Sequence, residues 1–336
     1  MSISPLRALG RPFLLAGAAL TAFALAACGG GGDAFDAASS STTAGAGGSA
    51  SSGGSATTVT VGGPTFTEAA IMEQMYVLLL EDAGVKTEVK TAGNRAIYTK
   101  SLQSGEIDVV PDYLGSMLNY LYNQANPDNK KPVSTSDVQA TLAKLREVGK
   151  PVGLGALEPA QASDQNAFYV TKKFAADNGN ITTLSQLAAL KKPVTLGADS
   201  FCDAPDQPFC VKGLKSTYGL DVTLKDSYEF GSVKLRTDVE NGVVDMGESG
   251  TTDGTLAANG MVILQDDKKL QPAENLVPVI NLKDASDPKV ATALNKLAPV
   301  LTTEDLTALN AKVDAERQKP ADVAKEYLTS KQLIGG

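Results

Sequence analysis

The stretch Ser104-Gly105-Glu106-Ile107-Asp108 decides the fold, because it has a counterpart at Asn241-Gly242-Val243-Val244-Asp245. In both stretches a glycine that can end a helix stands just before apolar residues typical of a buried strand. Each stretch closes a run of strand, helix, strand, helix and strand with short loops. Such runs predict a parallel sheet covered by helices on both faces. The side chains of the two halves differ, so we expect a repeated architecture and not a duplicated sequence.

The surrounding sequence supplies the other elements of both runs. In the first half we expect strands at 58–62, 86–90 and 107–110, a helix starting at 67 and a helix at 95–103. In the second half, strands at 193–196, 221–224 and 243–246 alternate with helices at 211–217 and 233–240. Apolar residues at helical spacing predict further helices at 287–298, 303–314 and 320–331, which would return to the first lobe.

A ligand cleft is expected where the strands end, since open parallel sheets bind ligands beyond the carboxyl ends of their strands. That rule selects the loops 62–67, 91–98, 111–116, 197–210, 225–232 and 247–253. Two short apolar stretches, 165–171 and 276–282, are the expected crossing strands. We therefore predict an α/β protein of two doubly wound lobes joined by a two-strand hinge, with a cleft that closes around its ligand. Residues 58–166 and 276–336 would form the first lobe, and 167–275 the second.

The N-terminal residues predict export and lipid anchoring. Arg7 and Arg11 precede an apolar stretch, 12–27, that is shorter than the roughly 20 residues of a membrane span. It ends in Leu25-Ala26-Ala27-Cys28, which resembles the lipobox where bacteria acylate a cysteine. We expect a signal peptide at 1–27, and a flexible tether rich in Gly, Ser and Ala at 28–57. The domain would then lie on the outer face of the cell membrane. The alternatives are an ordinary signal peptide with a chance cysteine, or a spanning helix.

Composition narrows the function further. Without residues 1–27, which hold two arginines and no acid, 28 Lys and Arg face 38 Asp and Glu, so nucleic acid is not an expected partner. The chain contains no histidine, which excludes Ser-His-Asp and Cys-His nucleophiles and disfavours a metal site. We expect no cofactor. Outside the cytoplasm, Cys202 and Cys210 most simply form a disulfide; two free buried thiols are the alternative.

Several motifs resemble the glycine betaine/choline/carnitine-type substrate-binding proteins of ABC importers. The first is Val61-Gly62-Gly63-Pro64-Thr65-Phe66-Thr67-Glu68, a strand and Gly-containing loop followed by Phe-Thr-Glu at a helix start. The second runs from Ser104 through Pro111-Asp112-Tyr113-Leu114-Gly115-Ser116 and is similar to the family's SGEIDxxPEYxGT. Thr183-Leu184-Ser185-Gln186-Leu187, Tyr218-Gly219-Leu220 and Thr251-Thr252-Asp253-Gly254 extend the resemblance. The spacing from Asn94-Arg95 to Tyr98 looks most like the actinobacterial branch.

The resemblance implies a type II periplasmic-binding-protein fold and a cleft containing tyrosines. A quaternary ammonium has no hydrogen to donate, so π faces and oxygens must hold it. Tyr113 matches the family's cage tyrosine, and Tyr98 could reach the same space. Asp112, Asn94 and Arg95 are further ligand-binding candidates, although Asp112 could be a satisfied buried acid and Arg95 could pair with it. The weaker candidates are Thr65, Thr251 and Thr252, which could instead cap helices.

Departures from the family pattern keep the ligand open. Asn166 takes the place of an aromatic residue in the family's NTYALAV-like stretch, and Pro272-Ala273-Glu274-Asn275 replaces a Pro-Tyr-Asn segment. The leading hypothesis is a monomeric receptor that captures glycine betaine, choline, carnitine or a related zwitterion and delivers it to a permease with its ATPase subunits. The alternatives are the same receptor with a polar or polyhydroxylated ligand, and a surface lipoprotein enzyme that uses carboxylates such as Asp112 and Glu248.

Overall fold

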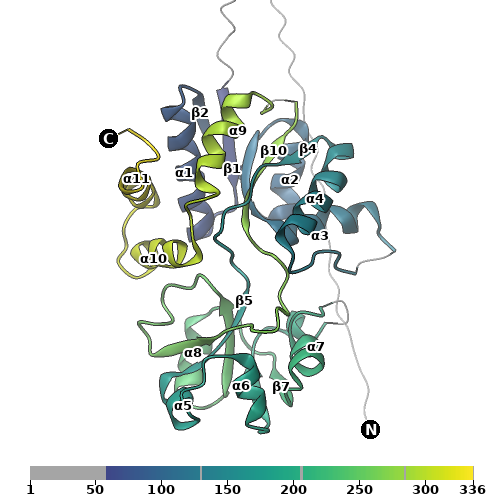
Figure 1. The fold of residues 1–336 in the computed structure, drawn as a ribbon, viewed down its shortest axis with the longest axis vertical. Helices are drawn as coiled ribbons and strands as arrows, with labels where there is room; N and C mark the ends of the chain where they lie inside the picture. The colour runs from purple at the N-terminus through teal and green to yellow at the C-terminus, as the bar shows by residue number, and fades with distance from the viewer. Residues whose placement is uncertain (1–57, 129–130, 205–206, 284, 336) are drawn as a thin grey trace, which may run out of the picture. The chain divides into compact units, whose positions relative to one another are not determined.

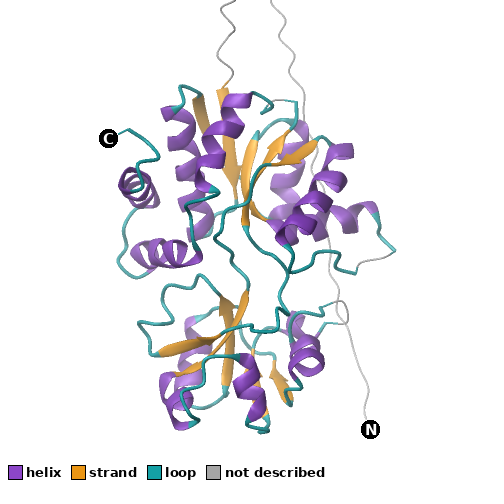
Figure 2. Cartoon of the chain, in the orientation of Figure 1, coloured by secondary structure: helices purple, strands orange, loops and turns teal. Residues whose placement is uncertain are grey.

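The computed structural model describes residues 58–335 apart from 129–130, 205–206 and 284. The expected signal peptide, Cys28 and the tether lie outside the described residues. The described part contains two five-stranded sheets, each with its own helices, and we call the part built on each sheet a lobe (Figures 1 and 2). Within these ranges, no helix has the length and apolar character that a membrane crossing requires.

The first lobe is built on a sheet of order β2-β1-β3-β10-β4. Its strands are β1 (Thr58–Gly63), β2 (Lys86–Thr91), β3 (Val109–Tyr113), β4 (Leu154–Ala156) and β10 (Leu276–Asn281). β1 pairs in parallel with β2 and β3, whereas β10 runs antiparallel to β3 and β4. The helices are α1 (Thr67–Asp82), α2 (Arg95–Ser104), α3 (Leu114–Ala125), α4 (Val138–Gly149), α9 (Pro288–Leu294), α10 (Thr303–Asp314) and α11 (Pro320–Ser330).

The second lobe repeats this topology with the order β7-β6-β8-β5-β9. Its strands are β5 (Asn166–Thr171), β6 (Val194–Gly197), β7 (Val222–Lys225), β8 (Met246–Gly250) and β9 (Met261–Leu264). β6 pairs in parallel with β7 and β8, and β5 runs antiparallel to β8 and β9. The helices are α5 (Lys172–Asp177), α6 (Leu184–Ala189), α7 (Val211–Gly213) with a π-helical continuation at Leu214–Tyr218, and α8 (Val233–Glu240).

The repeated stretches 104–108 and 241–245, which we call the joint, make the same hydrogen bonds in both lobes. The Asp108 backbone N–H donates to the Thr60 carbonyl at 2.8 Å, and the Asp108 carboxylate accepts from the Thr60 N–H at 2.7 Å. Asp245 makes the equivalent pair of bonds to Thr195, at 3.0 and 2.8 Å. The joint thus ties the start of the third strand to the first strand in each lobe, before the regular pairing begins.

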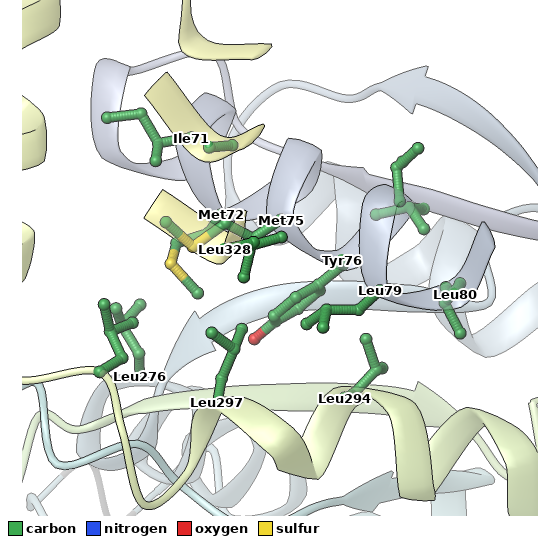
Figure 3. Packing of buried hydrophobic residues seen from close by; sticks show 14 of the residues in the cluster. Ile71, Met72, Met75, Tyr76, Leu79, Leu80, Leu276, Leu294, Leu297 and Leu328 are labelled. Atoms are coloured by element: carbon green, nitrogen blue, oxygen red, sulfur yellow. The ribbon is translucent and has the colours of Figure 1, made fainter. Parts of the chain in front are cut away.

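Both sheets are buried on two faces, because successive strand residues point to opposite sides. In β3, Val109 packs under α1 while its neighbour Val110 packs toward α2 and α3. Helix α1 is enclosed by the sheet and by the C-terminal helices. The residues of this contact that Figure 3 labels are Ile71, Met72, Met75, Tyr76, Leu79, Leu80, Leu276, Leu294, Leu297 and Leu328. Burying each leucine contributes about 1.5–3 kcal/mol, so the returning helices anchor the first lobe.

Three expectations about these elements were wrong. The sheets are mixed and not purely parallel, because β10 and β5 each run antiparallel to their neighbours. The third strands begin at Val109 and Met246, later than expected. The reason is that Ile107 and Val243 still donate their N–H groups back to the preceding helices. The expected crossing strands, β5 and β10, pair inside the sheets. The chain crosses beside them, where Ser163 and Asn275 form an isolated antiparallel bridge.

Candidate functional site

The crossing segments form the back of a cleft between the lobes. Residues of an extended segment alternate in direction. Ser163 and Gln165 line a small pocket on one side, whereas Asp164 and Asn166 line the pockets on the other side. The cleft has two compartments, which we call the acid compartment and the amide compartment after the side chains that distinguish them. Both lie at the carboxyl ends of the parallel strands, where ligands bind in such folds.

The acid compartment measures about 510 Å³ and is lined by both lobes. Its acidic residues are Glu68 at the start of α1, Asp164 on a crossing segment, Asp253 after β8 and Asp314 in α10. The other lining residues are Phe66, Thr67, Tyr113, Phe230, Gly231, Val233, Arg236, Ser249, Gly250, Thr252, Thr255, Asn310 and Arg317. Carboxylates therefore outnumber guanidinium groups on its walls.

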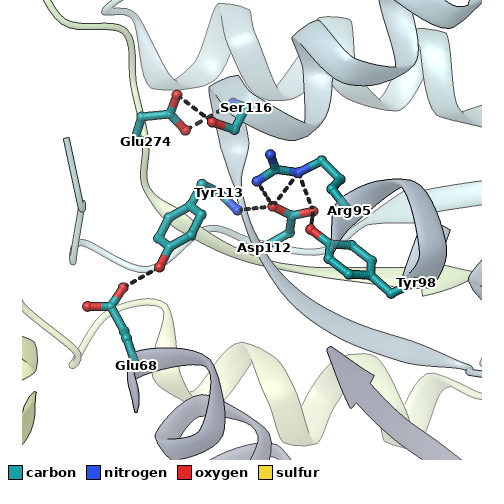
Figure 4. A network of polar contacts seen from close by, with 7 residues as sticks. All are labelled: Glu68, Arg95, Tyr98, Asp112, Tyr113, Ser116 and Glu274. Carbon is teal, nitrogen blue, oxygen red and sulfur yellow. Dashed lines mark hydrogen bonds and ion pairs between the residues drawn. The ribbon is translucent and has the colours of Figure 1, made fainter. Parts of the chain in front are cut away.

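Two carboxylates meet near Tyr113. The Tyr113 hydroxyl donates to Glu68 Oε1 at 2.7 Å, and the Asn310 amide donates to Glu68 Oε2 at 2.7 Å (Figure 4 shows the first of these). Asp164 accepts from the Thr252 N–H at 3.2 Å. Burial, and then the charge of Glu68, raises the pKa of Asp164 to about 7. A cation placed beside Asp164 would favour the ionised form of this carboxyl.

Aromatic rings border these carboxylates. The rings of Phe66 and Tyr113 lie nearly parallel, at 15°, with centroids 6.4 Å apart. Phe66 is 46% exposed and Phe230, on the second lobe, is 48% exposed. Both line the acid compartment with Tyr113. The compartment therefore offers π faces beside negative charge.

A guanidinium group stands on the second-lobe wall of the acid compartment. Arg236 is buried apart from 14% of its side chain and donates from Nη1 to the Gly231 carbonyl at 2.8 Å. It lies 3.7 Å from Asp253, which accepts hydrogen bonds from the Ser249 hydroxyl and from the N–H and hydroxyl of Thr255. Among the described residues that line this compartment, Arg236 is the partly buried cation and Arg317 is exposed, so Arg236 can receive the anionic end of a zwitterion.

The amide compartment measures about 440 Å³. It is lined by Arg95, Ser116, Asn119, Tyr120, Asn123, Pro132, Asn166, Phe201, Gln207, Phe209, Gln271, Pro272 and Glu274. Five of these side chains are carboxamides and three are aromatic. The first-lobe wall comes from α2 and α3, and the second-lobe wall from the loop between β6 and α7.

A buried ion pair separates the two compartments. Arg95 donates from Nη2 to Asp112 Oδ1 at 2.7 Å, and Tyr98 donates from its hydroxyl to Asp112 Oδ2 at 2.7 Å (Figure 4). Asp112 is 1% exposed and also accepts from the Tyr113 N–H. Burial and the charge of Asp112 raise the pKa of Tyr98, which keeps its hydroxyl protonated as a donor. This network fixes the end of β3, and with it the position of the Tyr113 ring.

Glu274 joins a crossing segment to the first turn of α3. Its carboxylate accepts from the Ser116 N–H at 3.0 Å and lies 3.1 Å from the Ser116 hydroxyl (Figure 4). Burial raises the pKa of Glu274 to about 7, against the opposing effects of Ser116 and Arg95. The site at the end of β3 thus couples one lobe to the segment that leads into the other.

The residues singled out from sequence fall into three groups. Tyr113 and Thr252 line the acid compartment, and Arg95 and Asn166 line the amide compartment. Tyr98 and Asp112 lie behind the cleft wall in the ion-pair network, and Thr251 accepts from the Gln165 N–H and donates to the Ser163 carbonyl. Asn94 precedes α2 without a side-chain capping bond, and Thr65 is exposed in the loop before α1.

Sequence reasoning missed several lining residues. Glu68 belongs to the first family motif and Glu274 to the segment 272–275, but neither they nor Asp164 were predicted as ligand-binding residues. Arg236 and Phe230 were not singled out. Acidic residues in an exported domain are common, so their number gave no signal. A usable signal for Asp164 was its place directly before the expected crossing strand 165–171, where side chains alternate toward the cleft.

The second-lobe aromatic residues of the amide compartment are held by a covalent link. In the structure Cys202 and Cys210 are joined by a disulfide, with Cα atoms 5.2 Å apart and both residues buried. Phe201 and Phe209 each directly precede one of these cysteines. The disulfide therefore restrains the loop that carries both rings.

A ligand cleft between two lobes of the same strand order defines a solute-binding protein of the type II periplasmic-binding-protein fold. The chain also matches, over residues 57–330, the family model OpuAC, described as the substrate binding domain of an ABC-type glycine betaine transport system. It belongs to this family, which confirms the resemblance read from its motifs. It is therefore an extracytoplasmic substrate-binding protein of an ABC importer, a class that binds small solutes and interacts with a permease.

Individual relatives agree with the family assignment. A glycine-betaine-binding protein of Pseudomonas aeruginosa is 28% identical, over 82% of this chain and 88% of that protein. The carnitine transport binding protein OpuCC of Listeria monocytogenes is 24% identical, over 83% and 88%. A crystal structure titled as a glycine betaine/carnitine/choline ABC transporter superposes with a TM-score of 0.69 at 23% identity, covering 83% of this chain and 99% of that one. Apo YehZ from Escherichia coli gives 0.66 at 22%, covering 83% and 100%, and shares the fold.

Proposed function

We propose that this chain captures a quaternary ammonium solute, such as glycine betaine, choline, carnitine or a related zwitterion, and delivers it to its permease. The observation that carries the proposal is the acid compartment. Two carboxylates, Glu68 and Asp164, stand beside the rings of Phe66 and Tyr113 in a cleft between the lobes. The names of the glycine betaine and carnitine relatives support the same ligand class.

The chemistry of the ligand fits these groups. A quaternary ammonium cannot donate a hydrogen bond, so it is held by π faces and by negative charge, each desolvated face contributing about 0.5–2 kcal/mol. Tyr113 and Phe66 approach from the first lobe and Phe230 from the second. In our proposal the ammonium group lies against these rings, and Thr252 and Asn310 complete the wall. Several such contacts approach the roughly 8 kcal/mol of a micromolar complex.

The proposed orientation places the anionic end of a zwitterion toward the second lobe. Arg236 offers a guanidinium there, partly buried and held by the Gly231 carbonyl. Charged groups from the two lobes would then hold opposite ends of one solute. A ligand that bridges the lobes favours the closed cleft over the open one, because it gains contacts only when both walls meet.

The test separates charge from shape. Choline and its carbon isostere 3,3-dimethylbutan-1-ol have the same outline, but only choline is a cation. Calorimetric titration of the detergent-solubilised full chain should give at least tenfold tighter binding for choline, about 1.4 kcal/mol. Glycine betaine and carnitine belong in the same series. Equal affinity for choline and the isostere, or no heat with any of the three ammonium solutes, would contradict the proposal.

The remaining parts of the proposal concern where the receptor works. It would be a monomer, anchored to the outer face of the cell membrane through acylated Cys28, and would pass its solute to a permease driven by ATPase subunits. It would carry out no chemistry itself. Leu25-Ala26-Ala27-Cys28 supports the anchor. Replacing Cys28→Ser should move the protein from the membrane to the soluble fraction, and unchanged membrane retention would remove the anchor from the proposal.

A further inference from the structure

The amide compartment differs in chemistry from the acid compartment, although both belong to one cleft. Its guanidinium, on Arg95, is already neutralised by Asp112 at 2.7 Å. Its only acidic lining residue, Glu274, is buried and accepts from the Ser116 N–H. The described walls therefore present little net charge. A compartment of this kind favours a neutral ligand, because a charged one would be desolvated without a counter-charge.

The polar groups on these walls can both donate and accept hydrogen bonds. Carboxamides provide two donors and an acceptor each. The Asn119 amide nitrogen donates to the Ser134 hydroxyl, and the amide oxygen accepts from the N–H groups of Val133 and Ser134. The Gln271 amide donates to the Phe209 carbonyl at 2.7 Å. These two amides shape the compartment. Asn123 differs, because its Oδ1 is buried without a hydrogen-bond partner among the described residues.

A buried acceptor without a hydrogen-bond partner in the protein can be paired by a donor group of a ligand. Leaving such an oxygen unpaired costs about 1–3 kcal/mol. Asn123 is on α3 of the first lobe, and the exposed carboxamide of Asn166, at the start of β5, lines the same compartment. A hydroxyl group suits this position, since it donates to the amide oxygen and accepts from a neighbouring amide N–H. The lining thus matches ligands that carry several hydroxyl groups.

Aromatic faces complete the match. Tyr120 belongs to α3, whereas Phe201 and Phe209 flank the disulfide of the second lobe. Phe201 is 60% exposed, which is high for so large an apolar side chain. The carbon-bound hydrogens of a polyol or sugar pack against such rings while its hydroxyls reach the amides.

We propose that the amide compartment is a second subsite of the cleft, which binds a neutral, hydroxyl-rich solute of the polyol or sugar class. It is distinct from the subsite for the ammonium group. Asn123 supplies the acceptor, Tyr120, Phe201 and Phe209 supply the flat apolar faces, and the disulfide holds two of the rings in place. The subsite stands on these contacts and does not depend on the ammonium ligand.

The test uses sorbitol and trehalose as probes for the amide compartment and choline for the acid compartment. Titration calorimetry on the detergent-solubilised full chain should detect at least one of the two hydroxylated probes at millimolar concentration. Asn123→Ala should weaken that probe about fivefold, through the loss of one hydrogen bond, and should leave choline affinity unchanged. Asn123 makes no hydrogen bond to another described side chain, so the variant should fold normally.

The matched control is Phe230→Ala, which alters only the acid compartment. It should weaken choline and leave the hydroxylated probe unchanged. Absence of binding by both hydroxylated probes at 10 mM, or equal affinity of the wild type and Asn123→Ala for them, would overturn the subsite. Failure of the ammonium proposal would appear separately, as choline that does not bind while the hydroxylated probe does.

Discussion

The Tyr113 hydroxyl donates a hydrogen bond of 2.7 Å to Glu68, a residue 45 positions earlier in the chain. This bond joins the family's tyrosine position to the first turn of α1. It commits the hydroxyl to the protein and leaves the ring of Tyr113, which lies beside Phe66, as the part that can contact a solute. Removing the Tyr113 hydroxyl and removing its ring should therefore have different effects on solute binding.

Substitutions at Tyr113 should separate the ring from the hydroxyl. For a quaternary ammonium ligand, Tyr113→Phe keeps the π face and should change affinity by less than about threefold. Tyr113→Ala removes the face and should weaken binding at least tenfold, about 1.4 kcal/mol.

The control for Tyr113 is Tyr98→Phe, which also removes a hydroxyl bond to a carboxylate. Tyr98 is 2% exposed and lies behind the cleft wall, so this variant should lose about 1–2 kcal/mol of unfolding free energy with little change in affinity. Calorimetry and urea denaturation distinguish the two effects. A folded Tyr113→Ala protein with wild-type affinity would remove Tyr113 from the site.

Ammonium binding should strengthen as the pH rises from 6 to 8. Burial and the charge of Glu68 raise the pKa of Asp164 to about 7, so its carboxyl is mostly protonated at pH 6 and mostly ionised at pH 8. A cation favours the ionised form, lowers this pKa on binding and releases a proton. Choline affinity should therefore increase, by up to about tenfold across this range.

Two variants assign that pH dependence to Asp164. Asp164→Asn cannot ionise and should give a flat profile between pH 6 and 8. Glu274→Gln removes the other cleft carboxyl whose pKa is raised to about 7, and should keep the wild-type slope because Glu274 lines the amide compartment. Affinity that falls with rising pH, or a slope that survives Asp164→Asn, would show that a different group controls binding.

The disulfide prediction concerns the mature protein. Mass spectrometry without reductant should find the Cys202–Cys210 pair two hydrogens lighter than the dithiol. Closing so short a loop restricts the unfolded chain, so the double variant Cys202→Ala with Cys210→Ala should lose about 2–3 kcal/mol of unfolding free energy. Two thiols that react with an alkylating reagent in protein isolated without reductant would show that the bond does not form.

The repeated joint should respond differently in the two lobes. Asp108 and Asp245 make the same bonds to their first strands, but Asp108 is buried and Asp245 is exposed. Asp108→Ala should cost about 1–3 kcal/mol, because the Thr60 N–H is left without its acceptor away from water. Asp245→Ala should cost less than about 1 kcal/mol, since water can replace the carboxylate at Thr195. Equal losses in urea denaturation would argue that burial does not set the cost.

Much of the fold could be predicted because its signals are local. The glycines at 105 and 242 predict the ends of α2 and α8 from neighbouring residues alone. The position of the antiparallel strand in each sheet was harder to predict. β10 and β5 reach their antiparallel places only after the chain has crossed between lobes, and no short pattern encodes that crossing. The delayed start of β3 and β8 likewise depends on bonds back to the preceding helices.

By itself, the sequence determined the class of this protein: an exported two-lobed binding protein of the glycine betaine transport family, with Tyr113 placed at a strand end. The tertiary structure decided which side chains meet there. Glu68 and Asn310 are 242 positions apart and share a hydrogen bond, while Asp112 binds Arg95 and Tyr98 behind the cleft wall. Periodicity and motifs act over a few residues, but a ligand compartment forms from distant residues, which only the packing of the whole chain brings into contact.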